Sequence, residues 1–243
     1  MNMTQYDITV AICTIGNRIF DITIPRSLPN NIKIKIFLQN PSVNISEYLG
    51  YPVNIVTGVG VNISRNIALK NCDTRFLYFM DDDLSVDFHQ LNQYIRHVKD
   101  NCSSAPVHLH GVENEFGNDR KSYLRDGGKL KLKNIFRWGI SEMLFEPGNF
   151  DSQTLLLTES FGAGTSLPIA DEAILLSSLI RKGYVIKYHD FKFASHNTFS
   201  SGMVDDYNSW QARKLACILI FKRYGYLVYL ALKVKITLRA YLR

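Results

Sequence analysis

A run of five apolar and aromatic residues, from Phe76 to Met80, ends abruptly at three consecutive aspartates, Asp81, Asp82 and Asp83. A short run without polar alternation is typical of a strand that is covered on both faces, as in parallel sheets. The aspartates then lie just beyond the carboxyl end of that strand. Open α/β sheets bind their ligands at this edge. The feature therefore predicts an α/β sheet with a carboxylate-rich site at one edge.

Strand-like and helix-like segments alternate along the rest of the chain. Strands are predicted at residues 8–13, 32–38, 53–57, 107–109 and 185–188, and helices at residues 62–71, 88–100 and 170–181. This alternation is typical of a mainly parallel sheet flanked by helices. The first helix is expected to begin at an Asn62 or Ser64 cap and to turn Ile63 and Ile67 towards the sheet. The polar, glycine-rich residues 113–133 are expected to form a mobile loop insertion.

The chain of 243 residues divides by composition into two parts. Residues 1–204 contain the predicted sheet and form one domain, and residues 205–243 form a basic, amphipathic helical appendage. From Trp210 to Arg243 the sequence has no aspartate or glutamate. Apolar residues of the appendage share one helical stripe, at Leu227, Leu230, Val234, Leu238 and Tyr241. Such a helix can lie on an anionic lipid surface, or pack against its own domain or a partner.

Composition also indicates where the protein works. The N-terminal segment lacks the basic and apolar stretches of a signal peptide, so none is expected. The four cysteines are scattered, and we expect them to be reduced in the cytoplasm. The net charge of +6 arises at the C-terminus, where basic residues alternate with aliphatic ones. This pattern argues against nucleic-acid binding, which uses exposed stacking aromatics, and predicts peripheral attachment at the inner face of the cell membrane.

Three adjacent carboxylates at a sheet edge repel one another unless a cation neutralises them. Mg²⁺ and Mn²⁺ prefer oxygen ligands, and such an ion can bridge to a diphosphate. Asp81, Asp82 and Asp83 are therefore candidates for a divalent metal site. The alternative is a solvated acidic turn that only caps the following helix. The position of the aspartates directly after a buried strand favours the metal site.

Three further segments accompany this cluster. They are a loop with Thr and Arg at residues 14–18, the segment GVGVNISRNIALKN at residues 58–71, and an acidic pair at residues 171–172 that opens a helix. Together with Asp81-x-Asp83, and in this order, they resemble the family 2 glycosyltransferases of the bacterial type that builds surface polysaccharides. The resemblance extends over nearly the whole chain. It implies a GT-A (Rossmann-like) fold, followed here by C-terminal amphipathic helices.

The resemblance also implies roles for residues around the aspartates. Asp83 would bind the metal together with Asp81 and His196, and Asp81 and Asp82 would contact the donor. The other implied donor-binding positions are Thr14, Arg18, Gln39, Asn40, Arg65 and Gly164. An arginine beside a diphosphate can form bidentate, charge-assisted hydrogen bonds. Gln39 and Asn40 replace the aspartate with which the family usually reads the base, so the nucleotide stays open, with a UDP-sugar favoured.

The acidic pair is implied to supply the general base that deprotonates the acceptor hydroxyl. The family order is commonly Glu then Asp, whereas Asp171 precedes Glu172 here. Register favours Glu172 as the base, and Asp171 is the alternative. The glycine-rich turn at residues 161–165 is expected to admit the sugar ring. Acidic residues are also favoured in the first turn of a helix by its dipole alone.

These observations predict a metal-dependent glycosyltransferase. It would transfer a sugar from a nucleoside diphosphate sugar to a hydroxyl of a glycan or lipid-linked glycan, with the inversion that the resemblance implies. One alternative is an aspartyl-nucleophile phosphatase that uses Asp81-x-Asp83, although several predicted strands precede the motif here. The other is a non-catalytic nucleotide-sugar-binding subunit, which the inverted order of Asp171 and Glu172 suggests.

Overall fold

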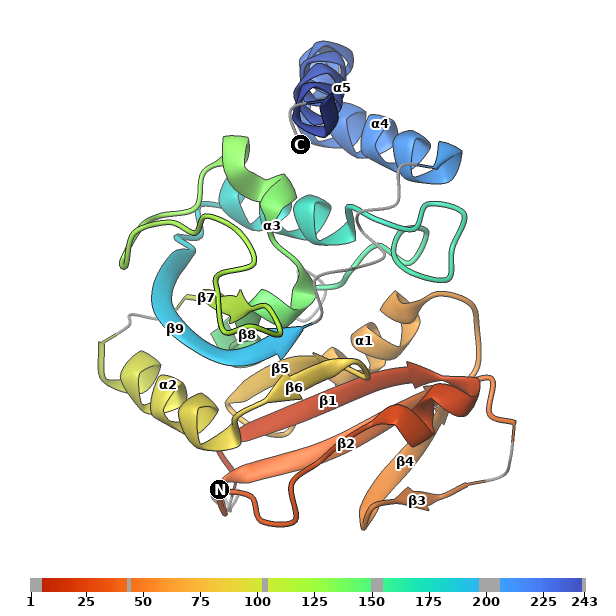
Figure 1. Cartoon of the computed structure of the whole chain (residues 1–243), viewed down its shortest axis with the longest axis vertical. Coiled ribbons are helices and arrows are strands. Elements are labelled where there is room, and N and C mark those ends of the chain that lie inside the picture. Colours follow the sequence, from red (N-terminus) through yellow and green to blue (C-terminus); the bar gives the residue numbers. More distant parts are fainter. Residues whose placement is uncertain (1–5, 43–44, 102–104, 150–154, 197–205, 242–243) are drawn as a thin grey trace.

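Nine strands form one sheet in the computed structural model, which describes residues 6–42, 45–101, 105–149, 155–196 and 206–241 (Figure 1). The strands are β1 (Ile8–Ile15), β2 (Ile32–Gln39), β3 (Glu47–Tyr48), β4 (Tyr51–Val56), β5 (Phe76–Asp81), β6 (Leu84–Val86), β7 (Val107–Glu113), β8 (Met143–Phe145) and β9 (Lys187–His196). Their order is β3-β4-β2-β1-β5-β8-β7-β9-β6. Neighbours among β4, β2, β1 and β5 are parallel, whereas β8 is antiparallel to both β5 and β7. The predicted parallel sheet thus forms the half of the structure that contains the aspartates.

Helices cover both faces of this sheet (Figure 1). The α-helices are α1 (Val61–Lys70), α2 (Phe88–Asn101), α3 (Asp171–Arg181), α4 (Tyr207–Phe221) and α5 (Gly225–Tyr241), and the 3₁₀ helices are η1 (Gly16–Asp21), η2 (Leu132–Arg137), η3 (Ile140–Glu142), η4 (Pro147–Asn149) and η6 (Lys222–Tyr224). One core contains Tyr78 and the apolar side of α2, and the other contains Phe79 with residues of α1 and α3. Strand β5 is therefore buried on both faces, which explains its continuous apolar run.

Helix α1 differs from its sequence-based prediction. It begins after Gly60, whose φ of 102° suits glycine, and neither Asn62 nor Ser64 caps it. The predicted core positions Ile63 and Ile67 are only partly buried. The fully buried residues are mostly polar, and they are Asn62, Ser64, Arg65, Asn66, Ala68 and Leu69. Because buried polar groups need hydrogen-bond partners, this helix is built to contact other polar groups.

Residues 113–133 are packed against the sheet, in contrast to the predicted mobile insertion. The hydroxyl of Tyr123 donates to the carbonyl of Val112 and accepts from its amide, both at 2.9 Å. The Tyr123 ring also stacks on that of Tyr188 in β9, with centroids 5.5 Å apart. Leu130 is buried, and its amide donates to the carbonyl of Ile186 at 2.9 Å. These two anchors hold a segment whose composition alone is typical of a free loop.

The predicted appendage contains two helices that pack on each other, and α4 also packs on α3. A side chain at Gly225 would place its Cβ 2.4 Å from the Cα of Ile218, so α5 starts in direct contact with α4. In the described part of the chain, one helical stretch, Tyr207–Leu238, is long and apolar enough by composition to cross a membrane, with a mean hydropathy of 1.6. Lys222, with φ of 49°, breaks this stretch into α4 and α5. The C-terminal amphipathic helices are thus confirmed as a packed pair.

Candidate active site

The carboxyl ends of β1, β2 and β5 bring the first predicted residues to one edge of the sheet. Strand β1 lies between the other two, with Cys13 opposite Asp81 and Ile15 opposite Gln39. Thr14, near the end of β1, therefore lies beside the aspartate turn that follows β5. Parallel strands that end together bring residues far apart in sequence to the same edge.

Asp82 points inward and anchors the aspartate turn. Its side chain is 6% exposed and accepts a 2.7 Å hydrogen bond from the Thr14 hydroxyl, and it pairs with the Arg18 guanidinium. Burial raises the pKa of Asp82, and the bond from Thr14 and the charge of Arg18 oppose that shift. Arg18 has a largely exposed side chain and lies 3.8 Å from Asp83. Of the Thr14, Arg18 and Asp82 side chains, Arg18 is therefore the one that can reach a ligand.

Asp83 and His196 are brought together by strand pairing. Strands β6 and β9 are antiparallel, with Leu84 opposite His196. The Nε2 atom of His196 lies 3.3 Å from a carboxylate oxygen of Asp83. This hydrogen bond is the main reason why the pKa of Asp83 is lowered. The Asp83 side chain is 47% exposed and that of His196 is 8% exposed, so the pair is accessible to a ligand through Asp83.

The metal site implied by the resemblance uses Asp81, Asp83 and His196. Among the described residues, no group of three or more Asp, Glu, His or Cys side chains is arranged to hold a metal ion. Asp81 instead contacts Arg65 at 3.2 Å, which leaves the exposed Asp83 with the buried His196 beside it. Mg²⁺ is often held by one or two carboxylates while substrate phosphates and waters complete its shell. The pair fits a site of that kind, in which the donor supplies further oxygens.

Arg65 lies between two acidic groups of the site. Its guanidinium is 3.2 Å from Asp81 and 3.5 Å from Asp171, and its side chain is 8% exposed. Opposite charges thus alternate along Asp81, Arg65 and Asp171, which compensates for their burial. The family resemblance implied a direct contact between Arg65 and the donor. In this structure the Arg65 guanidinium is instead engaged by the two carboxylates.

The acidic pair opens α3, and its two carboxylates have different surroundings. Asp171 is 2% exposed and accepts a 2.9 Å hydrogen bond from the side-chain amide of Asn62. Glu172 is half-buried and accepts a 3.3 Å hydrogen bond from the amide of Ile140. Burial, and then the charge of Asp171, raise the pKa of Glu172 well above its usual value. A carboxylate with a raised pKa binds a proton more tightly than an ordinary glutamate does, which suits Glu172 to proton transfer.

The glycine-rich turn at residues 161–165 packs on the start of α1. The amide of Val61 donates to the carbonyl of Ala163 at 2.9 Å. A Cβ on Gly164, where φ is 87°, would lie 3.3 Å from the Cα of Gly60. Glycine is therefore needed here for close approach of two backbones. Gly164 is also exposed, so it is accessible for the donor contact that the family resemblance implies.

Gln39 and Asn40 end β2 in different environments. Gln39 is buried, and its side-chain amide donates to the carbonyl of Gly60 at 3.1 Å. It therefore ties β2 to the start of α1. Asn40 is exposed and adopts a φ of 47°. Of the two predicted base-reading positions, Asn40 is the accessible one.

Asn62 and Asn66 form a pair of amide contacts that the sequence analysis did not include in the site. The side chain of Asn66 accepts from the amide of Leu157 at 2.8 Å and donates to its carbonyl at 2.9 Å. Asn62 donates to the carbonyl of Phe161 at 2.8 Å as well as to Asp171. One helical turn apart, the two asparagines hold the segment that leads to the acidic pair. Their spacing within residues 62–66 is the sequence signal for this contact.

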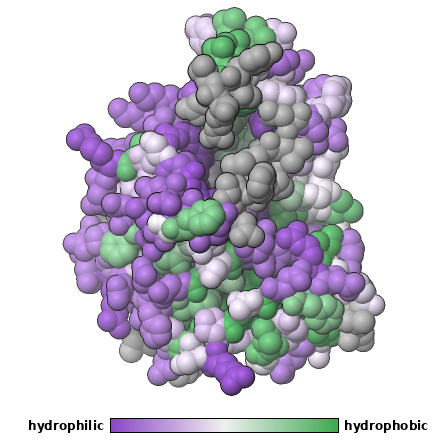
Figure 2. Space-filling view, in the orientation of Figure 1, coloured by the Kyte–Doolittle hydropathy of each residue, from purple (hydrophilic) through white to green (hydrophobic). Residues whose placement is uncertain are grey.

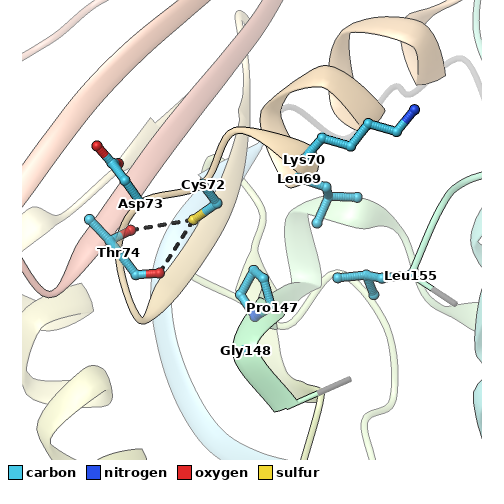
Figure 3. Close-up of a pocket in the computed structure, with 8 residues that line it drawn as sticks. All are labelled: Leu69, Lys70, Cys72, Asp73, Thr74, Pro147, Gly148 and Leu155. Atoms are coloured by element: carbon cyan, nitrogen blue, oxygen red, sulfur yellow. Dashed lines mark hydrogen bonds between the residues drawn. The ribbon is translucent and has the colours of Figure 1, made fainter. Parts of the chain in front are cut away.

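A cavity of about 360 Å³ lies away from this edge, at the C-terminal end of α1 (Figure 3). It is lined by Leu69, Lys70, Cys72, Asp73, Thr74, Pro147, Gly148 and Leu155. The Cys72 thiol donates to the carbonyl of Thr74 at 3.5 Å. The cavity lining includes none of the predicted site residues, so the cavity is separate from the candidate active site.

Comparisons with known proteins identify the fold. The sequence matches no protein-family model and no curated protein. The structure resembles that of S. aureus TarS 1-349, with a TM-score of 0.58 and 12% identity, covering 89% of this chain and 66% of that one. For TarS 1-349 in complex with UDP-GlcNAc the TM-score is 0.59 and the identity 13%, covering 89% of this chain and 67% of that one. For the complex of TarS 1-349 with UDP the TM-score is 0.57 and the identity 14%, covering 89% of this chain and 66% of that one.

At this level of identity the similarity concerns the fold. It supports a glycosyltransferase fold, as the sequence resemblance implied. The chain spans about two thirds of the TarS 1-349 structures and 40% of the longer TarS structure. The fold class is therefore confirmed, and the roles of individual site residues stay predictions.

Proposed function

We propose that this protein is a glycosyltransferase whose donor is a nucleoside diphosphate sugar, with a UDP-sugar favoured. The observation that carries the proposal is the series of charged groups along one sheet edge, from Asp83 and His196 through Asp81 and Arg65 to Asp171. A diphosphate needs cationic partners and an acceptor hydroxyl needs a base, and this edge offers groups for both. The glycosyltransferase fold supports the proposal, as do the UDP-GlcNAc and UDP complexes of the similar TarS structures.

The donor diphosphate is assigned to the accessible end of this series. Asp83 and His196 would hold Mn²⁺ or Mg²⁺, which when bound stabilises the negative charge of the departing diphosphate. Arg18, with an exposed side chain 3.8 Å from Asp83, donates charge-assisted hydrogen bonds to the same group. Asp82 and Thr14 keep the aspartate turn in the shape that this binding requires.

Glu172 is the proposed general base, and Asp171 is its positioning partner. As the acceptor oxygen bonds to the anomeric carbon, the bond from that carbon to the diphosphate breaks, and the acceptor proton passes to Glu172. This single displacement inverts the anomeric centre. The raised pKa of Glu172 makes its carboxylate a strong proton acceptor once it is ionised. Asn62 and Arg65 hold Asp171, which keeps the start of α3 in place.

The proposed acceptor is a hydroxyl of a glycan or lipid-linked glycan in surface polysaccharide biosynthesis. The proposed location is the cytoplasm, at the inner face of the cell membrane. The C-terminal helices support that location, because no aspartate or glutamate occurs from Trp210 to Arg243. A cationic surface of this kind is attracted to anionic lipids.

The first test is isothermal titration of UDP and GDP, with and without Mn²⁺. We expect UDP binding that requires Mn²⁺, is lost in Asp83→Ala and is kept in Asp73→Ala, which removes an exposed aspartate paired with Lys33. Binding that needs neither Mn²⁺ nor Asp83 would contradict the assigned metal site. Hydrolysis of a UDP-sugar then separates an enzyme from a non-catalytic binding subunit. Phosphatase activity without nucleotide binding would favour the aspartyl-nucleophile alternative.

A further inference from the structure

Exposed apolar side chains are concentrated on the C-terminal helices. Of the 18 large hydrophobic residues that are exposed in the described structure, ten lie between Tyr207 and Leu238. Figure 2 shows hydrophobic surface at the end of the molecule where α5 lies in Figure 1. A contiguous apolar surface of this kind marks an interaction site, whereas scattered exposed residues do not.

Helix α5 carries an apolar ridge on the side turned away from α4. Gly225 and Tyr229 are buried, and the Tyr229 ring lies 6.2 Å from that of Trp210 in α4. The ridge residues are 40–64% exposed and are Leu227, Leu230, Val234 and Leu238. At 3.6 residues per turn they lie opposite Gly225 and Tyr229, and Lys233 and Lys235 fall on the two flanks of the ridge. Both lysines are exposed.

The exposed side of α4 also carries apolar side chains. Leu215, Ile218 and Leu219 are 39–57% exposed and share one side of the helix. From Tyr207 to the C-terminus the sequence contains eight Lys and Arg residues and no Asp or Glu. The surface is therefore both apolar and purely cationic.

Charge and length distinguish the occupants that such a surface can have. A second copy of the chain would bring its own Lys233 and Lys235 close to those of the first copy, and these like charges repel. An anionic bilayer accepts the ridge at its acyl boundary while the lysine side chains reach up to its headgroups. Lys222 separates α4 from α5, and Lys233 and Lys235 interrupt the apolar residues of α5. Neither helix therefore offers the roughly 20 consecutive apolar residues that span a bilayer. The surface thus suits a helix that lies in the plane of the membrane.

We propose that the ridge of α5, with the exposed side of α4, is an in-plane anchor that binds the surface of an anionic lipid bilayer. The anchor would hold the enzyme beside a lipid-linked acceptor, and in this respect it rests on the proposed function. Binding to the lipid surface itself depends only on the residues of these two helices.

Sedimentation of the full chain with phospholipid vesicles tests the anchor. Two preparations are compared, one of phosphatidylcholine alone and one that also contains phosphatidylglycerol. The variants are a ridge variant with Leu227→Ser, Leu230→Ser, Val234→Ser and Leu238→Ser, a charge variant with Lys233→Gln and Lys235→Gln, and the control Phe116→Ser. Phe116 is 77% exposed and lies outside α4 and α5, so its change removes exposed apolar surface elsewhere on the molecule.

We expect the wild type and the control to bind the anionic vesicles, and salt to weaken that binding. The ridge variant should bind more than about tenfold less, and the charge variant roughly fivefold less per lysine, on anionic vesicles only. The proposal would be overturned if the ridge variant bound the anionic vesicles as well as the wild type does, or if the wild type bound neither vesicle preparation. A wild-type dimer that the ridge variant converts to a monomer would also overturn it. Titration of UDP on the same samples separates a failed anchor from a failed donor site.

Discussion

At the scale of single residues, Arg65 neutralises two carboxylates with one buried guanidinium. Arg65→Met would leave Asp81 and Asp171 with uncompensated charge in a partly buried site. We expect the free energy of unfolding to fall by about 3 kcal/mol, which is the lower end of the range seen when one partner of a buried pair is removed. Urea denaturation measures this change. Lys33→Met, which breaks an exposed pair with Asp73, should cost less than about 1 kcal/mol. Equal losses in the two variants would show that burial of Arg65 is energetically unimportant.

The raised pKa of Glu172 predicts how the transfer rate depends on pH. A general base must be ionised, so the rate should fall as pH decreases through the raised pKa of Glu172. Asp171→Asn removes the neighbouring negative charge, which lowers the pKa of Glu172. We therefore expect the acid limb of the pH–rate profile to move to lower pH in this variant. An unchanged profile would mean that another group limits the rate.

The role of Glu172 itself is tested by a variant of the same shape. Glu172→Gln should reduce the transfer rate by about 10²–10⁴-fold, because it cannot accept a proton. Binding of UDP in the presence of Mn²⁺ should be unchanged, since the donor contacts lie elsewhere on the edge. Initial rates and titration on the same preparation measure the two effects. A normal transfer rate in this variant would assign the role of general base to Asp171.

The types of residue in the candidate site were easier to predict than the directions in which their side chains point. The three aspartates follow a buried strand, so their position at the sheet edge could be read from the sequence. Their separate environments could not, because the backbone after the strand turns Asp82 inward to Thr14 while Asp83 faces His196. The direction of Arg65 likewise depends on where α3 places Asp171. Such directions come from tertiary packing rather than local sequence.

At the scale of elements, α1 joins the sheet edge to the acidic pair through its asparagines. Asn66→Ala would remove both hydrogen bonds to the backbone of Leu157, which leaves buried groups unpaired. We expect a loss of about 1–3 kcal/mol in unfolding free energy and faster hydrogen exchange in residues 155–167. Asn71→Ala, which removes an exposed bond to the carbonyl of Ile67, is the matched control. Unchanged exchange in residues 155–167 would contradict a holding role for Asn66.

The helix itself was predicted, but its buried side was not. Periodicity favours Ile63 and Ile67 as the inward residues, whereas the structure buries Asn62 and Asn66 more fully. The difference arises because one side of α1 contacts polar backbone in residues 157–162. A rule based on apolar spacing misses a helix whose partner offers carbonyl groups.

At the scale of the whole molecule, the parallel half of the sheet follows from the sequence, and the other half follows only in part, because segments of β7 and β9 were predicted while β6 and β8 were not. Strands β1, β2, β4 and β5 have apolar or alternating patterns. Strand β8 has only three residues, Met143–Phe145, and is held between β5 and β7 by pairs such as Tyr78 with Leu144. A strand so short has no local signal that distinguishes it from a buried turn. Its place in the sheet depends on the elements around it.

Burial of neutral histidines between α2 and the sheet predicts that the whole molecule loses stability in acid. His110 packs 4.1 Å from the Phe193 ring, its Nδ1 bonds the carbonyl of Gly111 at 3.0 Å, and burial lowers its pKa to about 3. His189, also buried, has its pKa lowered to about 4 for the same main reason. The unfolded chain takes up these protons near pH 6.5 and the folded chain does not. The stability that these neutral histidines contribute is therefore fully present above pH 6.5 and is lost as pH decreases towards 3 or 4.

For His110 alone the expected loss between pH 7.5 and pH 5 is up to about 2 kcal/mol. Urea denaturation at the two pH values measures it. His110→Phe keeps a ring in the same apolar surroundings and has no group to protonate, so its unfolding free energy should depend less on pH. His89→Gln, at an exposed position of α2, should keep the wild-type dependence. If His110→Phe retained the full wild-type loss, the acid sensitivity would belong to other groups, of which His189 is the first to test, since burial also lowers its pKa, to about 4.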